Sequence, residues 1–398
     1  MIRIAARAGP LYSAERGQAL IALLMLLLIG GGALVYTMVR PAALSIERDK
    51  ATIAALAQAR DALIGYAAAD NRPGSLPCPD INNNGSAGSP IPTDCPGHVT
   101  GSSVYVGRLP WRTLGLPDLR DGSGERLWYA VSREFARNFS SCGSCPLNSG
   151  TSGQLTITGS ASGIIAIVFS AGAVVNAQVR DTGNENTAAN YLEGGNENGA
   201  TTSIFFTNST SSFNDKLLAI TSDTLFPAAE MRVAREARAI LLEFYKGNVF
   251  FPYANAYSDN TYQCTENEYS GRIPRYLTDS CKTDPADPDW KGAGWPSWFF
   301  ANNWHQVVFY AVASKCAKPS SPACSAAGGL LSVSTMPPPN SDIQALLIMP
   351  GRAFAGQTRP CATVGDCLED PENTDADNVY VKSALTSSVN DRLVVVAP

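Results

Sequence analysis

The residues best suited to chemistry in this sequence are cysteines and histidines, and neither set forms a convincing reactive site. Cys142-Gly143-Ser144-Cys145 has redox spacing, but such a pair needs a helix N-terminus, and this one lies among Ser, Gly and Asn. The two histidines, His98 and His305, are too few for a zinc site beside oxidised cysteines, and His305 is expected to be structural. No G-x-S-x-G or P-loop sequence occurs. The sequence therefore predicts no enzyme and no catalytic residues.

A second group of residues has the spacing of a metal site. Asp80, Asn82 and Asn84 match the first half of a calcium loop, in which oxygens at alternate positions wrap a hard cation. Gly85 permits the sharp turn, but Ile91 stands where the closing glutamate belongs. A turn held by asparagine side chains explains the same residues. Calcium therefore remains one of two interpretations, and no other cofactor is expected.

The cysteine count indicates disulfides. All ten cysteines lie beyond residue 70, and an even number is typical of a chain in an oxidising compartment. Pairing between sequence neighbours would close short loops, two of which enclose sixteen residues. The expected pairs are Cys78 with Cys95, Cys142 with Cys145, Cys264 with Cys281, Cys316 with Cys324, and Cys361 with Cys367.

The elements that carry these residues follow an apolar N-terminal segment. Residues Gln18 to Val39 contain no charge over 22 residues, and about 20 helical residues cross a bilayer. Because Arg3, Arg7 and Arg16 precede the segment, we expect a single-pass bacterial inner-membrane protein with a short cytoplasmic N-terminus. Its bulk would be periplasmic or on an extracellular filament. A cleavable secretory signal fits poorly, since no A-x-A site follows, whereas a plain uncleaved anchor stays open.

Glu15-Arg16-Gly17-Gln18-Ala19-Leu20-Ile21 resembles the cleavage site of type IV pilins and pseudopilins. The resemblance implies that a prepilin peptidase cuts after Gly17, that Gln18 becomes the N-terminus, and that the helix packs with other pilin or pseudopilin subunits. Major pseudopilins also bind calcium near their sheet. Most pilins have glutamate where Ala22 stands; some minor pilins and the large tip pseudopilin lack it. A subunit without this glutamate, which pairs with a neighbour's N-terminal amine, is most easily placed at the tip.

The chain beyond residue 40 contains matching landmarks in the same order in both halves. Gly107-Arg108-Leu109-Pro110 matches Gly271-Arg272-Ile273-Pro274, and Trp128–Ser132 matches Phe309–Ala313. Further matches are Gln178-x-Arg180 with Gln357-x-Arg359, and Asn214–Leu217 with Asn390–Leu393. Each half opens with an amphipathic helix and continues in strand-like runs.

We therefore expect an α+β chain in which a long N-terminal transmembrane and stalk helix leads into two tandem pilin-like units. In each unit a helix packs on an antiparallel sheet. The predicted parts are a leader (1–17), a transmembrane helix (18–40), a first unit with the stalk continuation (41–225) and a second unit (226–398).

The function predicted from these features is that of a structural subunit. We expect a minor pilin or tip-like pseudopilin of a type IV filament or type II secretion system. Its partners would be the prepilin peptidase, other subunits and the inner membrane, and no basic stripe indicates nucleic acid. The alternative is an anchored adhesin that uses residues 290–304, which hold four of the six tryptophans. The same tryptophans could equally pack between the two units. A third alternative, an anchored periplasmic hydrolase, has no recognisable catalytic site in the sequence.

Overall fold

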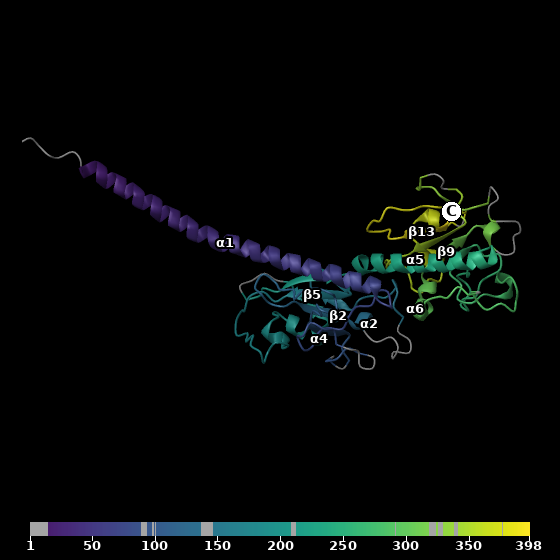
Figure 1. The fold of residues 1–398 in the computed structure, drawn as a ribbon, viewed down its shortest axis with the longest axis horizontal. Helices are drawn as coiled ribbons and strands as arrows, with labels where there is room; N and C mark the ends of the chain where they lie inside the picture. The colour runs from purple at the N-terminus through teal and green to yellow at the C-terminus, as the bar shows by residue number, and fades with distance from the viewer. Residues whose placement is uncertain are drawn as a thin grey trace, which may run out of the picture.

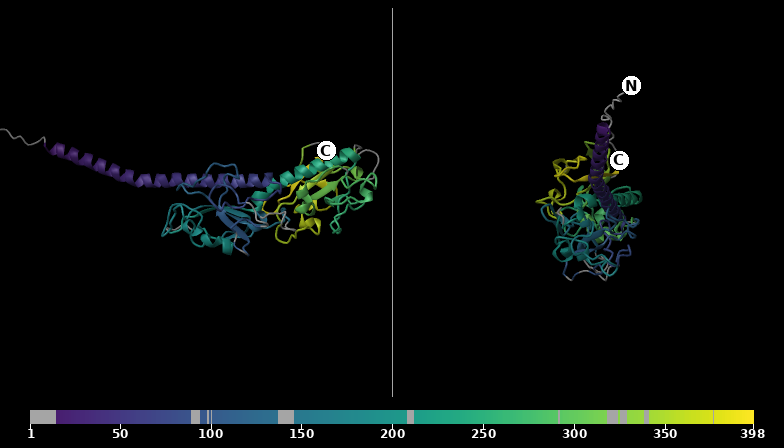
Figure 2. Two further views of the ribbon diagram at one scale, coloured as in Figure 1. Left: turned by 60° about the horizontal axis from the view of Figure 1, so that its bottom comes forward. Right: turned by 90° about the vertical axis from the view of Figure 1, so that its left-hand side faces the viewer.

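The computed structural model describes residues 15–88, 94–97, 99, 101–136, 146–207, 212–290, 292–317, 324, 329–337, 341–375 and 377–398. The molecule is elongated: a long helix projects from one end, and two globular units follow one another along its direction (Figure 1). The left view of Figure 2 shows the same arrangement, with the second unit at the end opposite the projecting helix.

The first element is the helix α1, Glu15–Ala69, which is 55 residues long and continues through Gly30–Gly32 and Pro41. Its Ala- and Leu-rich sequence favours helix on both sides of these residues, which are themselves poor helix formers. A search of the described residues found no helix that combines the length and the apolar character needed to cross a membrane. The expected fold class is therefore wrong in its transmembrane element, residues 18–40. The α+β class itself holds, since helices and sheets make up both units.

The first unit is built around a four-stranded antiparallel sheet. Its strand order is β1-β2-β5-β7, and the strands are β1 (Val104–Arg108), β2 (Trp128–Ser132), β5 (Ala166–Ser170) and β7 (Lys216–Ile220). A smaller sheet of order β4-β3-β6 covers one face; it consists of β3 (Leu155–Ile157), β4 (Ala161–Ile164) and β6 (Ile204–Phe205). The expected strand at 155–158 thus lies outside the main sheet. Two short helices, α2 (Arg133–Ala136) and α4 (Gly199–Thr202), complete the unit.

The second unit repeats the arrangement of the main sheet. Its order is β8-β9-β11-β13, again antiparallel, with β8 (Ser270–Arg272), β9 (Phe309–Val312), β11 (Ala345–Met349) and β13 (Arg392–Ala397). Three of these strands, β8, β9 and β13, carry a landmark that matched the corresponding strand of the first sheet. A separate parallel pair joins β10 (Ser332–Val333) to β12 (Val379–Tyr380). The helices are α5 (Ser222–Asn248) and α6 (Ser297–Ala301).

One helix covers each main sheet, and the two helices also contact each other. The C-terminal half of α1 packs on β5 and β7, while α5 packs on β11 and β13. Arg232 of α5 donates to the carbonyl oxygens of Ala68 and Asp70, where α1 ends. These main-chain acceptors have no partner within the helix, so α5 completes the end of α1. A single hydrophobic core therefore runs from α1 through α5 into the second sheet.

Candidate functional site

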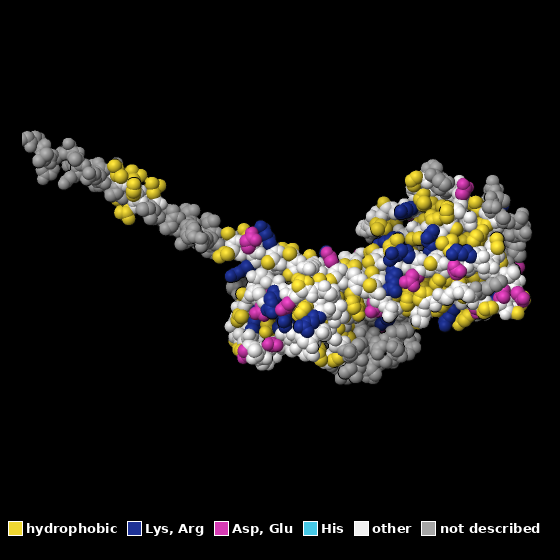
Figure 3. Space-filling view, in the orientation of Figure 1, with side chains coloured by type: hydrophobic (Ala, Val, Ile, Leu, Met, Phe, Trp, Pro, Cys, Tyr) yellow, Lys and Arg dark blue, Asp and Glu magenta, His cyan; other side chains and the backbone are white. Residues whose placement is uncertain are grey.

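The projecting half of α1 carries an exposed apolar surface. Seven large apolar side chains between residues 21 and 28 are each more than half exposed: Ile21, Leu23, Leu24, Met25, Leu26, Leu27 and Leu28. They form the yellow group on the projecting helix in Figure 3, remote from both units. Leu44 and Ile46, nearer the first unit, are also exposed. Isolated exposed leucines need no explanation, but a contiguous apolar group of this size indicates an interaction surface.

The second half of the same helix has the opposite environment. Its buried side chains recur every three to four residues and face the first sheet: Ala55, Leu56, Ala59, Leu63 and Ala67. Burying one large aliphatic side chain is worth roughly 1.5–3 kcal/mol. The transition lies near Thr52, whose hydroxyl oxygen accepts a hydrogen bond from the amide of Gly122 at 2.9 Å. The body thus holds α1 by its C-terminal half and leaves the N-terminal half for another contact.

Gly17 and Gln18, the predicted processing residues, lie in the first turn of α1, which begins at Glu15. Ala22 follows within the same helix. Cleavage after Gly17 would therefore remove the beginning of α1 and leave its exposed apolar group intact. This prediction is not tested by the fold.

The predicted calcium residues form a compact turn. The two carboxylate oxygens of Asp80 accept hydrogen bonds from the amides of Asn82 (3.0 Å) and Gly85 (2.6 Å). The side-chain oxygen of Asn84 accepts from the amide of Ser86 at 2.8 Å. These contacts are those of the asparagine-held turn, in which the oxygens serve the backbone. Among the described residues no three His, Cys, Asp or Glu side chains are grouped to hold a metal ion.

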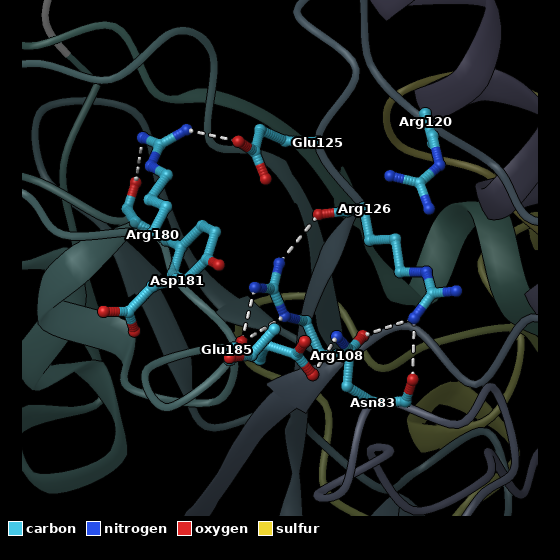
Figure 4. A pocket seen from close by; sticks show the side chains of 10 residues that line it. Asn83, Arg108, Arg120, Glu125, Arg126, Arg180, Asp181 and Glu185 are labelled. Atoms are coloured by element: carbon cyan, nitrogen blue, oxygen red, sulfur yellow. Dashed lines mark hydrogen bonds and ion pairs between the residues drawn. The ribbon is translucent and has the colours of Figure 1, made fainter.

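Beside this turn lies a polar cavity of about 540 Å³ in the first unit (Figure 4). Four arginines and three carboxylates line it, together with Asn83, Thr182 and Tyr191; the charged residues are Arg108, Arg120, Arg126, Arg180, Glu125, Asp181 and Glu185. Arg126 forms a two-point ion pair with Asp118, and this pair lowers the pKa of the Asp118 carboxyl. Arg180 pairs with Glu125 at 3.3 Å. Arg120, Arg126 and Arg180 are thus already paired with carboxylates, which weakens the attraction of the cavity for an anion.

Arg108 shows what the cavity residues do. Its guanidinium lies between the rings of Trp128 and Tyr191, 4.2 and 4.0 Å from their centroids. It donates to the carbonyl oxygens of Glu185 and Arg126. Arg272, the counterpart in the second unit, likewise donates to the carbonyl oxygens of Ala256, Tyr257 and Asp259. The repeated Gly-Arg landmark is thus a structural clamp that holds loops to the first strand of each sheet.

The tryptophan-rich segment packs inside the molecule. Trp290 and Trp304 are buried, and Trp290 meets Phe244 of α5 edge to face, with ring centroids 5.6 Å apart. The side-chain oxygen of Asn302 accepts from the amide of Leu147, in the first unit, at 3.2 Å. The segment therefore contacts both α5 and the first unit. These contacts favour a packing role over an exposed binding patch.

His305 is fully buried between the rings of Tyr262 and Phe300. Burial, with smaller contributions from Arg275 and Arg272, lowers the pKa of His305 to about 3. The imidazole is therefore neutral at physiological pH. Its position in an aromatic cluster agrees with the predicted structural role.

Four of the five expected disulfides are present: Cys78–Cys95, Cys264–Cys281, Cys316–Cys324 and Cys361–Cys367. Cys142 and Cys145 lie outside the described residues. Disulfides indicate an oxidising environment, periplasmic or extracellular. The expected inner-membrane location is contradicted, because no helix among the described residues is long and apolar enough to cross a membrane.

Sequence reasoning missed two pairs of carboxyl groups, in each of which the aspartate is buried. Asp215 is bonded to the amide of Glu193, and Asp391 to the amide of Glu369, at the same separation of 22 residues. The signal was available: Leu192-Glu193 and Leu368-Glu369 stand at matching distances before the Asn-Asp landmark.

Comparison with known proteins adds no relative to this picture. No protein-family model, curated protein or solved structure matches the chain.

Proposed function

We propose that the protein is a structural subunit of a type IV filament or type II secretion system, in the manner of a minor pilin or tip-like pseudopilin. The observation that supports this most is the exposed apolar group at residues 21–28 on the projecting half of α1. An apolar helix that leaves its own globular body needs an apolar partner in water. Helices of neighbouring subunits have that character in the family that residues 15–21 resemble.

The arrangement of the two units supports a place at the filament tip. The second unit lies beyond the C-terminal end of α1, at the end of the molecule opposite the projecting helix (Figures 1 and 2). A subunit of this shape extends away from the assembly on the side where a tip has no neighbour. Ala22 agrees with this place, because a tip subunit needs no glutamate to pair with a subunit above it.

The processing of residues 1–17 tests the proposal. Co-expression with an active prepilin peptidase should shorten the chain by 17 residues and leave Gln18 as its N-terminus. Gly17→Ala should block the change, whereas Gly65→Ala, later in the same helix where an added Cβ meets no atom within 4 Å, should leave it intact. An unchanged mass in the presence of active peptidase would contradict membership of this class.

A further inference from the structure

The two missed carboxyl pairs occupy equivalent places in the two units. In the first unit the amide of Glu193 donates to Oδ2 of Asp215 at 2.8 Å, and the amide of Asn214 donates to Oε2 of Glu193 at 2.9 Å. In the second unit the corresponding bonds measure 3.0 Å each, from Glu369 to Asp391 and from Asn390 to Glu369. Two units that differ elsewhere thus keep one polar arrangement.

A glutamine completes each pair. Nε2 of Gln178 donates to Oε1 of Glu193 at 2.6 Å, and Nε2 of Gln357 donates to Oε1 of Glu369 at 2.9 Å. The glutamine follows the third strand of the sheet, whereas the aspartate immediately precedes the fourth. Each carboxyl pair therefore ties together both ends of the long segment that connects these two strands.

Each pair has four carboxyl oxygens. The two main-chain amides and the glutamine side chain donate to three of them, and the fourth accepts no hydrogen bond from the described residues. Oδ1 of Asp215 and Oδ1 of Asp391 are buried, and neither has a hydrogen-bond partner in the described part of the chain. The two carboxyl groups of each pair are neighbours, because the glutamate's own amide donates to the aspartate and the amide that precedes the aspartate donates to the glutamate. Asp215, Glu193 and Asp391 are buried and Glu369 is half-buried. Repulsion between two neighbouring carboxylates away from water favours a state in which the pair holds one proton.

In the described part of the chain no arginine donates a hydrogen bond to either pair of carboxyl groups. Around the first pair, Asn196 donates to Asp215, and Arg180 donates to the side-chain oxygen of Gln178. Around the second pair, Arg359 donates to the sulfur of Cys361 and to the carbonyl oxygen of Asp366, and Tyr257 lies nearby. Arg359 acts on Glu369 and Asp391 only through space.

We propose that each unit is closed by one proton shared between its glutamate and aspartate, and that loss of this proton releases the segment between the third and fourth strands. Burial raises the pKa of Asp215 and of Asp391 above the ordinary aspartate range, with the neighbouring glutamate adding to the effect. A raised pKa stabilises the closed state fully below the unfolded pKa of 3.8. The stabilisation is lost as the pH rises toward the folded value.

The two units should respond unequally. The segment of the second unit contains the Cys361–Cys367 disulfide, whereas residues 171–215 of the first unit contain no cysteine. The first segment also supplies Arg180, Asp181, Glu185 and Tyr191 to the cavity of Figure 4. Rising pH should therefore open the first unit before the second and remove one wall of this cavity.

Hydrogen–deuterium exchange of the full-length oxidised protein, corrected for the intrinsic pH dependence of exchange, tests the proposal. Opening that releases one proton becomes about tenfold more favourable per pH unit. The protection factor of amides in residues 172–207 should therefore fall about tenfold per unit above roughly pH 5, with a smaller fall in 351–391. Asp215→Asn, which keeps a neutral donor facing Glu193, should abolish this slope in the first unit and leave that of the second unchanged.

Asp181→Asn is the matched control, because Asp181 is an exposed carboxylate of the same segment. It should retain the wild-type slope. Protection independent of pH in the wild type, or an unchanged slope in Asp215→Asn, would overturn the proposal. If Asp215→Asn does not fold, the infrared carbonyl band of a buried protonated carboxylic acid at pH 7 decides in its place: its presence in the wild type supports the shared proton, and its absence overturns it.

Discussion

Oε1 of Glu230, in the middle of α5, accepts a hydrogen bond from the amide of Gly351 at 2.9 Å. Its other oxygen forms an ion pair with Arg392 at 2.8 Å, and the Glu230 side chain is fully buried. In the first unit, Lys216 likewise opens the last strand and pairs with a helical carboxylate, Asp49, at 2.6 Å. There both side chains are largely exposed, and the amide of Gly172 is bonded to Asp121 instead. The same contact thus exists in a buried and an exposed version.

The buried pair of Glu230 and Arg392 should contribute more to the free energy of unfolding than the exposed pair of Asp49 and Lys216. Glu230→Ala should lower the free energy of unfolding by about 3–5 kcal/mol, because it leaves Arg392 half-buried without its carboxylate. Asp49→Ala, the matched control, should cost less than about 1 kcal/mol, as is usual for an exposed ion pair. Urea denaturation of the oxidised chain measures both values. Equal losses would contradict the difference in burial.

Acidic pH should destabilise the protein through His305. Its pKa is about 3 in the folded state against 6.5 ordinarily, so the unfolded chain binds the proton first as the pH falls. The free energy of unfolding therefore falls by about 1.4 kcal/mol per pH unit as the pH drops from 6.5 toward 3. His305→Phe should remove roughly 3 kcal/mol of the loss between pH 7 and pH 4. Unfolding curves at the two pH values give the difference, and parallel losses in both proteins would refute the assignment.

The disulfides should contribute according to the length of the loops they close. Cys78 and Cys95 are 17 residues apart and Cys361 and Cys367 are 6 apart. On the chain-entropy model their removal as Cys→Ala pairs should cost about 3 and about 2 kcal/mol respectively. Thermal unfolding of the two double variants compares them. Peptide mapping should also find Cys142 joined to Cys145, and free thiols there would contradict the expected pairing.

Much of each unit could be predicted from short matches along the chain. Gly107-Arg108 and Gly271-Arg272 carry the same clamp in the structure, and the Tyr-Ala-Val runs form the second strand of each sheet. Local patterns of this kind report on one strand or turn. The matching distances mark Glu193 and Glu369 as equivalent residues, but they do not show that each meets an aspartate 22 residues later, because that contact depends on how a long segment folds back.

The prediction for α1 failed for a different reason. The absence of charge from residue 18 to residue 39 predicts a membrane span, but no helix among the described residues is long and apolar enough to cross a membrane. Hydropathy alone does not state what an apolar helix contacts. The same limit affected the tryptophans. Their clustering predicts either a binding patch or packing. Trp290 and Trp304 are buried, Trp290 meets Phe244 of α5, and Asn302 bonds to the first unit, which favours packing.

The environment of Leu24 and Leu27 tests the proposed function most directly. A photo-crosslinking amino acid placed at either position, in cells that express the corresponding filament or secretion system, should capture other pilin-like subunits. Leu385 is the matched control, since it is similarly exposed but lies in the second unit. Cross-links from Leu24 and Leu27 to such subunits, and none from Leu385, are the predicted result. The same pattern at all three positions, or no subunit captured from α1, would contradict the account.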